Sequence, residues 1–152
     1  MLTIDTIMTT DLITVPPSAT LAEARELMHD HRIHHLPVVD ANDGLIGLLT
    51  LTDVLAASDS RLRARDSRMR AKDIAISEVM TTDIATVQES ASLRQAALFL
   101  ERHKIGCLPV MSGDKLKGII TDTDFVGVAI NLLEQIEETE PVGEDLDDVG
   151  VA

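Results

Sequence analysis

The feature that most constrains the fold of this chain is an internal sequence repeat. The first copy contains the blocks MTTDLITVPPSATLAEA, HRIHHLPVV and GLLTLTDVL, which begin at Met8, His31 and Gly47. The second copy contains MTTDIATVQESASLRQA, HKIGCLPVM and GIITDTDFV, in the same order, beginning at Met80, His103 and Gly118. Three matched blocks in one order indicate an internal duplication, so the fold must be built from two similar units.

Each copy predicts a β-α-β-β-α unit, and therefore an α/β fold in the broad sense (α+β). A short strand is expected around Ile13 in the first copy and around Ala85 in the second. A helix follows, with a capping-box pattern at its start: TLAE from Thr20 and SLRQ from Ser92. Two strands (LPVV and LIGLLT, then LPVM and LKGIIT) and a second helix complete each unit. A unit of roughly 55 residues is marginal alone, so we expect the two to bury their exposed sheet faces against each other.

The expected boundaries follow from the repeat. Residues 1–57 form the first repeat, 58–73 an Arg-rich linker, 74–133 the second repeat, and 134–152 an acidic tail that is partly disordered. The linker holds six Arg or Lys residues, which predicts a solvated and helical segment or an electrostatic partner for the acidic tail. The last helix is expected to reach about Glu138 and to stop before Pro141.

Charge and composition exclude several classes of function. No Lys or Arg follows Lys117, whereas ten Asp or Glu do, which argues against nucleic-acid binding. The apolar runs are too short to span a membrane, and MLTIDTIMTT does not read as a signal peptide. Cys107 is the only cysteine, so no intrachain disulfide can form and a reducing, cytoplasmic location is expected. The HEXXH, P-loop and GxGxxG motifs are absent, and an enzyme is not expected.

The repeated pattern MTTDLITV…IHHLPVVD…GLLTLTD and MTTDIATV…IGCLPV…GIITDTD resembles a tandem pair of cystathionine-β-synthase (CBS) domains, from Ile7 to about Ile130. The resemblance implies a stand-alone regulatory module, a pseudo-twofold pair whose clefts bind AMP, ADP or ATP, sometimes S-adenosylmethionine, without catalysis. It also implies a homodimer of such pairs that acts on an unknown effector protein. A ligand-free interaction or scaffold dimer, or a metal-binding CBS protein, remains an alternative.

The resemblance also implies which residues contact the ligand. In the family, the motif aspartate binds the ribose hydroxyls and the motif Thr or Ser residues bind phosphate. Those positions are Thr50, Thr52 and Asp53 in the first copy, and Thr121, Thr123 and Asp124 in the second. The residues around the strand prolines face the cleft: Ile33, His34, His35 and Pro37, then Ile105, Gly106, Cys107 and Pro109. Contacts to adenine come from the first strand of the opposite copy, around Ile13 and Ala85.

Physical chemistry supports the same polar residues. A carboxylate can accept both hydroxyls of a ribose diol, and free N–H groups at a helix start suit a phosphate. The alternative is that Thr and Asp simply cap the second helix. Because all three polar residues occur in both copies, ligand binding is favoured over capping alone.

The two clefts are not expected to be equal. The second motif carries Asp122 where the first carries Leu51, and a carboxylate repels phosphate unless a cation such as Mg²⁺ bridges them. His34 and His35 stand where the second copy has Gly106 and Cys107, and none of these four positions holds an Arg or Lys. AMP is therefore favoured over a polyphosphate, or else the phosphate is bound by protonated histidine in a pH-dependent way. No cofactor is required, and no dedicated metal site is expected in the histidine cluster.

Overall fold

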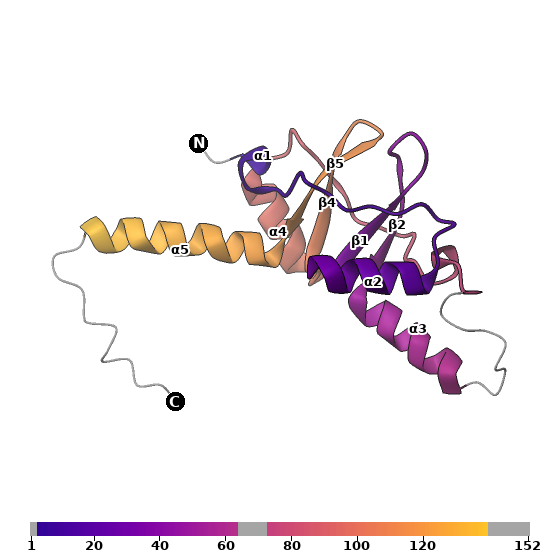
Figure 1. The fold of residues 1–152 in the computed structure, drawn as a ribbon. Helices are drawn as coiled ribbons and strands as arrows, with labels where there is room; N and C mark the ends of the chain where they lie inside the picture. The colour runs from indigo at the N-terminus through magenta and orange to yellow at the C-terminus, as the bar shows by residue number, and fades with distance from the viewer. Residues whose placement is uncertain (1–2, 64–72, 140–152) are drawn as a thin grey trace, which may run out of the picture.

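The computed structural model describes residues 3–63 and 73–139. The first copy contains α1 (Ile4–Ile7), α2 (Leu21–His31), β1 (His35–Val39), β2 (Leu45–Thr50) and α3 (Leu51–Arg63). The second contains a 3-10 helix, η2 (Ile76–Glu78), then β3 (Val87–Gln88), α4 (Leu93–His103), β4 (Cys107–Ser112), β5 (Lys115–Thr121) and α5 (Asp122–Thr139). Figure 1 shows the two hairpins, β1–β2 and β4–β5, side by side at the centre of the molecule.

Each copy is organised around one antiparallel hairpin. In the first copy β1 pairs with β2, and in the second β4 pairs with β5. The strand β3 adds to the second hairpin in parallel, which gives a three-stranded sheet beside a two-stranded one. The predicted mixed helix-and-strand fold is confirmed, and the second copy has the predicted β-α-β-β-α order.

The first strand of the first copy is where the prediction was wrong. No strand forms around Ile13; only a single parallel bridge joins Val15 to Val38. Pro16 and Pro17 follow Val15, and because proline has no N–H, the ladder cannot continue through them. The second copy has Gln88 and Glu89 at these positions, and the Glu89 N–H donates to the Met111 carbonyl at 2.9 Å.

The starts of the first helices follow the sequence prediction closely. Thr20 and Glu23 form a reciprocal capping box, at 3.2 and 3.1 Å between side chain and backbone. Ser92 and Gln95 form the same arrangement at the start of α4. Both helices end at a histidine, and the next residue, Arg32 or Lys104, adopts the left-handed conformation. The first helices of the two copies therefore end in the same way.

The MTTD segment of each copy pairs with the hairpin of the other copy. Thr9 exchanges two backbone hydrogen bonds with Ile119 of β5, and Thr81 exchanges two with Leu48 of β2, all between 2.9 and 3.0 Å. A Cβ on Gly118 would lie 2.6 Å from the Met8 sulfur, and Gly47 has the same relation to Met80. Each motif glycine therefore makes room for a methionine from the other copy.

This exchange extends into the two hydrophobic cores. The first core is built on Leu21, Leu36 and Leu49 of the first copy but also contains Ile74 and Ile76 from the chain entering the second. The second core is built mainly on residues of α4, β4 and β5, and it contains Ile4 and Met8 from the N-terminal end. The chain before each repeat thus completes the core of the other, which ties the two copies together.

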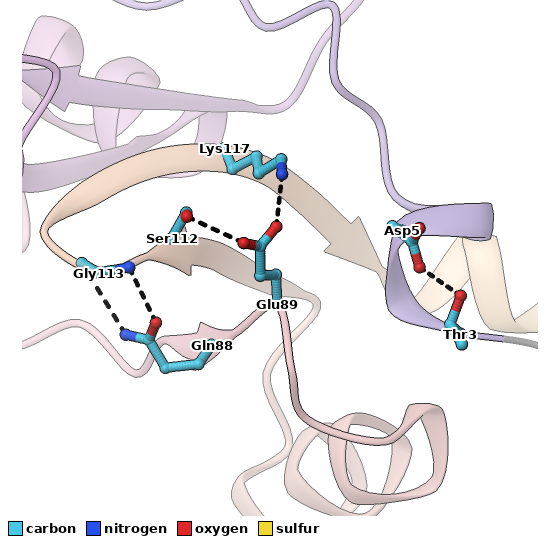
Figure 2. Close-up of polar contacts among 7 residues, drawn as sticks. All are labelled: Thr3, Asp5, Gln88, Glu89, Ser112, Gly113 and Lys117. Atoms are coloured by element: carbon cyan, nitrogen blue, oxygen red, sulfur yellow. Dashed lines mark hydrogen bonds and ion pairs between the residues drawn. The ribbon is translucent and has the colours of Figure 1, made fainter.

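The strand β3 is held at its end by side chains (Figure 2). The Glu89 carboxylate accepts a hydrogen bond from Ser112 at 2.9 Å and forms an ion pair with Lys117 at 2.6 Å. The Gln88 amide bonds both the N–H and the carbonyl of Gly113, in the β4–β5 turn. The lysine ammonium lowers the pKa of Glu89, and the carboxylate raises the pKa of Lys117. Figure 2 also shows Thr3 bonded to Asp5 at the start of α1.

The second helices run past the expected repeat boundaries. α3 continues beyond residue 57 to Arg63, and α5 continues beyond residue 133 to Thr139. Residues 64–72 of the predicted linker and 140–152 of the predicted tail lie outside the described residues. Within the described ranges, no helix is both long enough and apolar enough to cross a membrane.

Candidate functional site

Two clefts lie between the copies, and each takes residues from both. The first, here the Thr121 cleft, has a volume of about 520 Å³. From the first copy it is lined by the segment Thr9–Ile13, except for Thr10, and by residues 31–35 with Pro37. From the second copy it is lined by Ile119, Thr121, Asp122 and Thr123. A ligand there would touch residues more than a hundred positions apart in sequence.

The second cleft, here the Thr50 cleft, is the counterpart with the copies exchanged. It has a volume of about 590 Å³. From the first copy it is lined by His35, Leu48 and Thr50; its second-copy lining is Thr81, Asp83, Ile84, Ala85, Phe99, His103, Ile105, Gly106 and Cys107. Both clefts fall within the 300–1,000 Å³ range of small-molecule sites.

Most of the predicted site residues line these clefts. Ile13, Ile33, His34, His35 and Pro37 meet Thr121 and Thr123 in one; Ala85, Ile105, Gly106 and Cys107 meet Thr50 in the other. Thr52, Asp53, Asp124 and Pro109 are not among the lining residues of either cleft. Pro109 is buried in β4 opposite Ile119, and Asp53 and Asp124 lie half-buried on the first turns of α3 and α5.

The motif threonines cap the second helices in both copies. The Asp53 N–H donates to the Thr50 hydroxyl at 3.1 Å, and the Asp124 N–H donates to the Thr121 hydroxyl at 3.4 Å. In the second copy the Asp124 carboxylate also accepts the Thr121 N–H at 2.9 Å, which completes a capping box. Thr50 and Thr121 therefore do act as helix caps, as the alternative interpretation expected. The capping bonds also fix their hydroxyls at the cleft wall.

The helix starts are also tied to the residues before the strand prolines. The Leu51 N–H donates to the His34 carbonyl at 2.9 Å, and the Asp122 N–H donates to the Gly106 carbonyl at 3.1 Å. A Cβ on Gly106 would lie 3.4 Å from the Asp122 carboxylate, in ordinary van der Waals contact.

The charges around the two clefts differ. The Thr121 cleft is lined by Arg32 and three histidines (31, 34 and 35), together with Asp11 and Asp122. The described lining of the Thr50 cleft holds no Arg or Lys, and its titratable groups are His35, His103, Asp83 and Cys107. The Thr50 cleft holds instead the stacked rings of Phe99 and His103, 4.2 Å apart. The expected inequality of the clefts is present in their lining.

His35 is half-buried and lines both clefts. Burial lowers the pKa of His35, and the neighbouring His34 lowers it further, whereas the Asp122 carboxylate acts in the opposite direction. The imidazole is therefore held toward its neutral form when no anion is near. A phosphate in either cleft would favour the protonated form.

Cys107, the counterpart of His35, is buried and carries no thiolate at neutral pH. Burial, assisted by the Asp122 and Asp124 carboxylates, raises the pKa of Cys107 to about 12. A nucleophilic cysteine needs the opposite shift. This thiol therefore packs as a small apolar group at the cleft wall.

Sequence reasoning missed the contribution of the MTTD segments. Thr9, Asp11 and Leu12 line one cleft, and their counterparts Thr81, Asp83 and Ile84 line the other. The signal that could have found them is the identity of MTTD in both copies, which no helix or strand pattern explains. The other missed lining residues are His31, Arg32 and Ile119 in one cleft, and Leu48 and His103 in the other.

The histidine cluster does not assemble a metal site in the part of the chain that the structure describes. No three His, Cys, Asp or Glu side chains there lie close enough together to hold a metal ion.

Comparison with curated proteins finds relatives of two kinds, a small CBS domain-containing protein and longer enzymes. The CBS domain-containing protein YhcV of Bacillus subtilis is 32% identical over 118 residues, which cover 78% of this chain and 79% of YhcV. Homoserine O-acetyltransferase of Methanocorpusculum labreanum is 36% identical over 121 residues, but the match covers only 23% of that enzyme. The chain thus spans less than a quarter of the length of such enzyme relatives.

Solved structures share the fold over nearly the whole chain. A Vibrio cholerae protein described as an acetoin utilization protein (AcuB) is 43% identical with a TM-score of 0.75, covering 93% of this chain and 99% of that one. CBSX2, solved in complex with AMP, is 31% identical with a TM-score of 0.74, covering 88% and 99%. The family model of the CBS domain matches residues 4–60 and again residues 76–131. The chain therefore belongs to the CBS-domain family and carries a tandem pair of these domains.

Proposed function

We propose that this protein is a regulatory sensor that binds an adenine nucleotide, AMP first and ADP or ATP second, in the clefts between its two CBS domains. It requires no cofactor, although Mg²⁺ accompanies a polyphosphate. The bound or free state is read by an effector protein, and the chain itself performs no catalysis.

The observation that carries this proposal is the composition of the Thr121 cleft. Its lining includes the apolar side chains of Ile13 and Ile33, and also Thr121 and Thr123, which lie at the start of α5. An adenine ring suits the first set, and phosphate oxygens suit the hydroxyls and the positive end of the α5 dipole. A nucleotide is the class of small molecule that has both parts.

Asp11 and Asp122 bear on the choice of nucleotide. Both carboxylates line the Thr121 cleft, so a di- or triphosphate there would meet two negative charges. Arg32 offsets this repulsion for a single phosphate, and the imidazole N–H groups of the three histidines can donate hydrogen bonds to it. The balance favours AMP over ATP unless Mg²⁺ is present.

Two relatives support the proposal. CBSX2 is described in complex with AMP and shares 31% identity over almost its whole length. YhcV is matched over 79% of its length, whereas in the homoserine O-acetyltransferase relatives a comparable stretch occupies about a quarter of a longer enzyme. A module found both by itself and attached to enzymes is typical of regulation.

The test is a titration of the full chain with AMP, ADP, ATP and S-adenosylmethionine, followed by calorimetry and thermal melting. A ligand that binds only the folded state raises the melting temperature with concentration. Thr123→Val removes a hydroxyl from the Thr121 cleft and is expected to weaken AMP binding there about tenfold. Thr10→Val makes the same chemical change at an exposed neighbour that does not line the cleft, and it should leave affinity unchanged.

A flat response to all four ligands would reject the sensor and favour the ligand-free scaffold. A response to S-adenosylmethionine alone would keep the site but replace the ligand. Equal weakening by both valine variants would show that the effect is on stability rather than on binding.

A further inference from the structure

His35 belongs to the walls of both nucleotide clefts. Among the residues that the structure describes, it is the only one that lines the Thr121 cleft and also the Thr50 cleft. It begins β1, and its register partner on β2 is Thr50. The Asp122 carboxylate, which lines the Thr121 cleft, acts on the pKa of His35 in the upward direction and so lies near the ring. A ligand in either cleft therefore meets the same imidazole.

The second copy supplies no equivalent of this ring. Cys107 is the counterpart of His35; it begins β4 and has Thr121 as its register partner on β5. In the described structure Cys107 lines the Thr50 cleft but not the Thr121 cleft. Burial raises the pKa of its thiol to about 12, so this side chain stays neutral. One ionisable ring is thus shared by two clefts.

A single imidazole can donate to two phosphates only in its protonated form. The neutral ring has one N–H donor and one nitrogen acceptor, whereas the imidazolium has two N–H donors. A phosphate dianion offers only acceptor oxygens, so a neutral His35 that donates to a phosphate in one cleft has only a lone pair for a phosphate in the other. Burial and the neighbouring His34 lower the pKa of His35, which keeps the ring neutral in the free chain at pH 7 and above. A second phosphate therefore needs a proton.

We propose that His35 couples the occupancy of the two clefts: the chain binds its second phosphorylated ligand by taking up one proton on the His35 ring. The clefts then compete for a single N–H group at high pH, and this competition is relieved as the pH falls. The inference rests on the proposed function, because it requires that phosphorylated ligands occupy both clefts. It makes the second binding step depend on pH and on the first step.

The other titratable and charged groups around the ring belong to one cleft or the other. In the Thr121 cleft they are Asp11 of the first MTTD segment, His31 of α2, Arg32 and His34 after it, and Asp122 of α5. In the Thr50 cleft they are Asp83 of the second MTTD segment, His103 of α4 and Cys107 of β4. A histidine that lines one cleft is protonated in response to the ligand in that cleft. Of the described lining residues, only His35 can make the proton count of one cleft depend on the ligand in the other.

Calorimetry of the full chain with AMP, in two buffers of different ionisation enthalpy, counts the protons taken up at each binding step. We expect the second step to take up about one proton between pH 6.5 and pH 8.5. The ratio of the second dissociation constant to the first should then rise with pH by up to about tenfold per pH unit. Titration of the AMP phosphate itself, with a second pKa of about 6, affects both constants alike and cancels in this ratio.

A matched pair of variants assigns the proton to His35. His35→Gln keeps hydrogen-bonding groups but cannot be protonated, so the clefts should compete at every pH and the ratio should lose its pH dependence. His103→Gln makes the same change at a residue that lines the Thr50 cleft alone, and it should keep that dependence. Histidine-ring NMR of the wild type reads the same proton without a substitution: the His35 signal should change from neutral to protonated as the second AMP binds.

Three results would overturn the proposal. If AMP fills both clefts without proton uptake at the second step and without a change in the His35 signal, the ring does not couple them. If the ratio keeps its pH dependence in His35→Gln, the proton belongs to another group. One AMP per chain at every pH shows that the clefts are never filled together. All three leave the proposed function standing, because AMP still binds; if AMP does not bind at all, the proposed function fails and the coupling fails with it.

Discussion

At the scale of single residues, the glycine of the repeated GLLT and GIIT motifs has a packing role. Gly47 and Gly118 face methionines delivered by the opposite copy. In the sequence this glycine belongs to a motif interpreted as ligand-binding. Its packing role could not be predicted, because Met8, the residue that Gly118 contacts, lies about 110 positions away in the sequence. A residue that is identical in both copies of a motif can therefore indicate a packing contact between the copies as well as a ligand-binding site.

Gly118→Ala is expected to destabilise the protein by about 1–3 kcal/mol, because the new methyl group would overlap the Met8 side chain. Gly127→Ala is the control: nothing lies within 4 Å of a Cβ there, and alanine is a better helix former by about 0.5–1 kcal/mol. Urea unfolding of both variants measures the two changes. Equal destabilisation by both would contradict the proposed role of the methionine contact.

His35 gives the protein a pH dependence with a definite sign. Burial lowers the pKa of His35 in the folded state, so the unfolded chain binds this proton at higher pH than the folded chain does. Stability is then complete above about pH 6.5, the ordinary histidine pKa, and falls as pH drops from there toward the folded pKa. Urea unfolding between pH 8 and pH 5 should show a shallower loss for His35→Gln than for the wild type. Parallel curves for the two proteins would contradict the assignment.

At the scale of secondary-structure elements, local signals predicted the helices well. The capping boxes at Thr20 and Ser92 depend on residues three positions apart, and both formed as expected. The first strands were less predictable, because a strand needs a partner. The ITV stretch resembles ATV, but the following Pro16 and Pro17 remove the N–H groups that a parallel ladder requires.

Thr20→Ala should cost about 1 kcal/mol of stability, since it leaves the Glu23 N–H without its side-chain acceptor. Ser90→Ala, in an exposed turn, is the control and should change stability by less than about 0.5 kcal/mol. Chemical denaturation followed by circular dichroism compares them. A loss at Thr20 no greater than that at Ser90 would show that the cap is energetically unimportant.

At the scale of the whole molecule, the repeat pattern did not predict that the two copies exchange segments of their hydrophobic cores. Repeat boundaries group residues by chain order, whereas Ile4 packs in the second core and Ile76 in the first. The clefts follow the same rule, because each MTTD segment lines a cleft with the hairpin of the other copy. The motifs indicated most of the lining residues, but the MTTD contribution depends on contacts distant in sequence.

The exchange predicts where mutations act. Ile4→Ala leaves a cavity in the second core and should accelerate amide hydrogen exchange in β4 and β5 more than in β1 and β2. Ile76→Ala should have the reverse pattern, because Ile76 packs in the first core. Mass spectrometry of deuterium uptake reads both variants. If amide hydrogen exchange rises in the same hairpin for both variants, the two isoleucines do not pack in opposite cores and this interpretation is contradicted.

The central claim is that a nucleotide occupies the clefts between the copies, and backbone NMR during a titration of the full chain with AMP tests it most directly. The predicted result is saturable shifts at both walls of the Thr121 cleft, at Thr9–Ile13 and at Thr121–Thr123, with a smaller or weaker set around Thr50 and Ala85. Saturating AMP that leaves these amides unmoved, or that shifts only residues outside both clefts, would contradict the account.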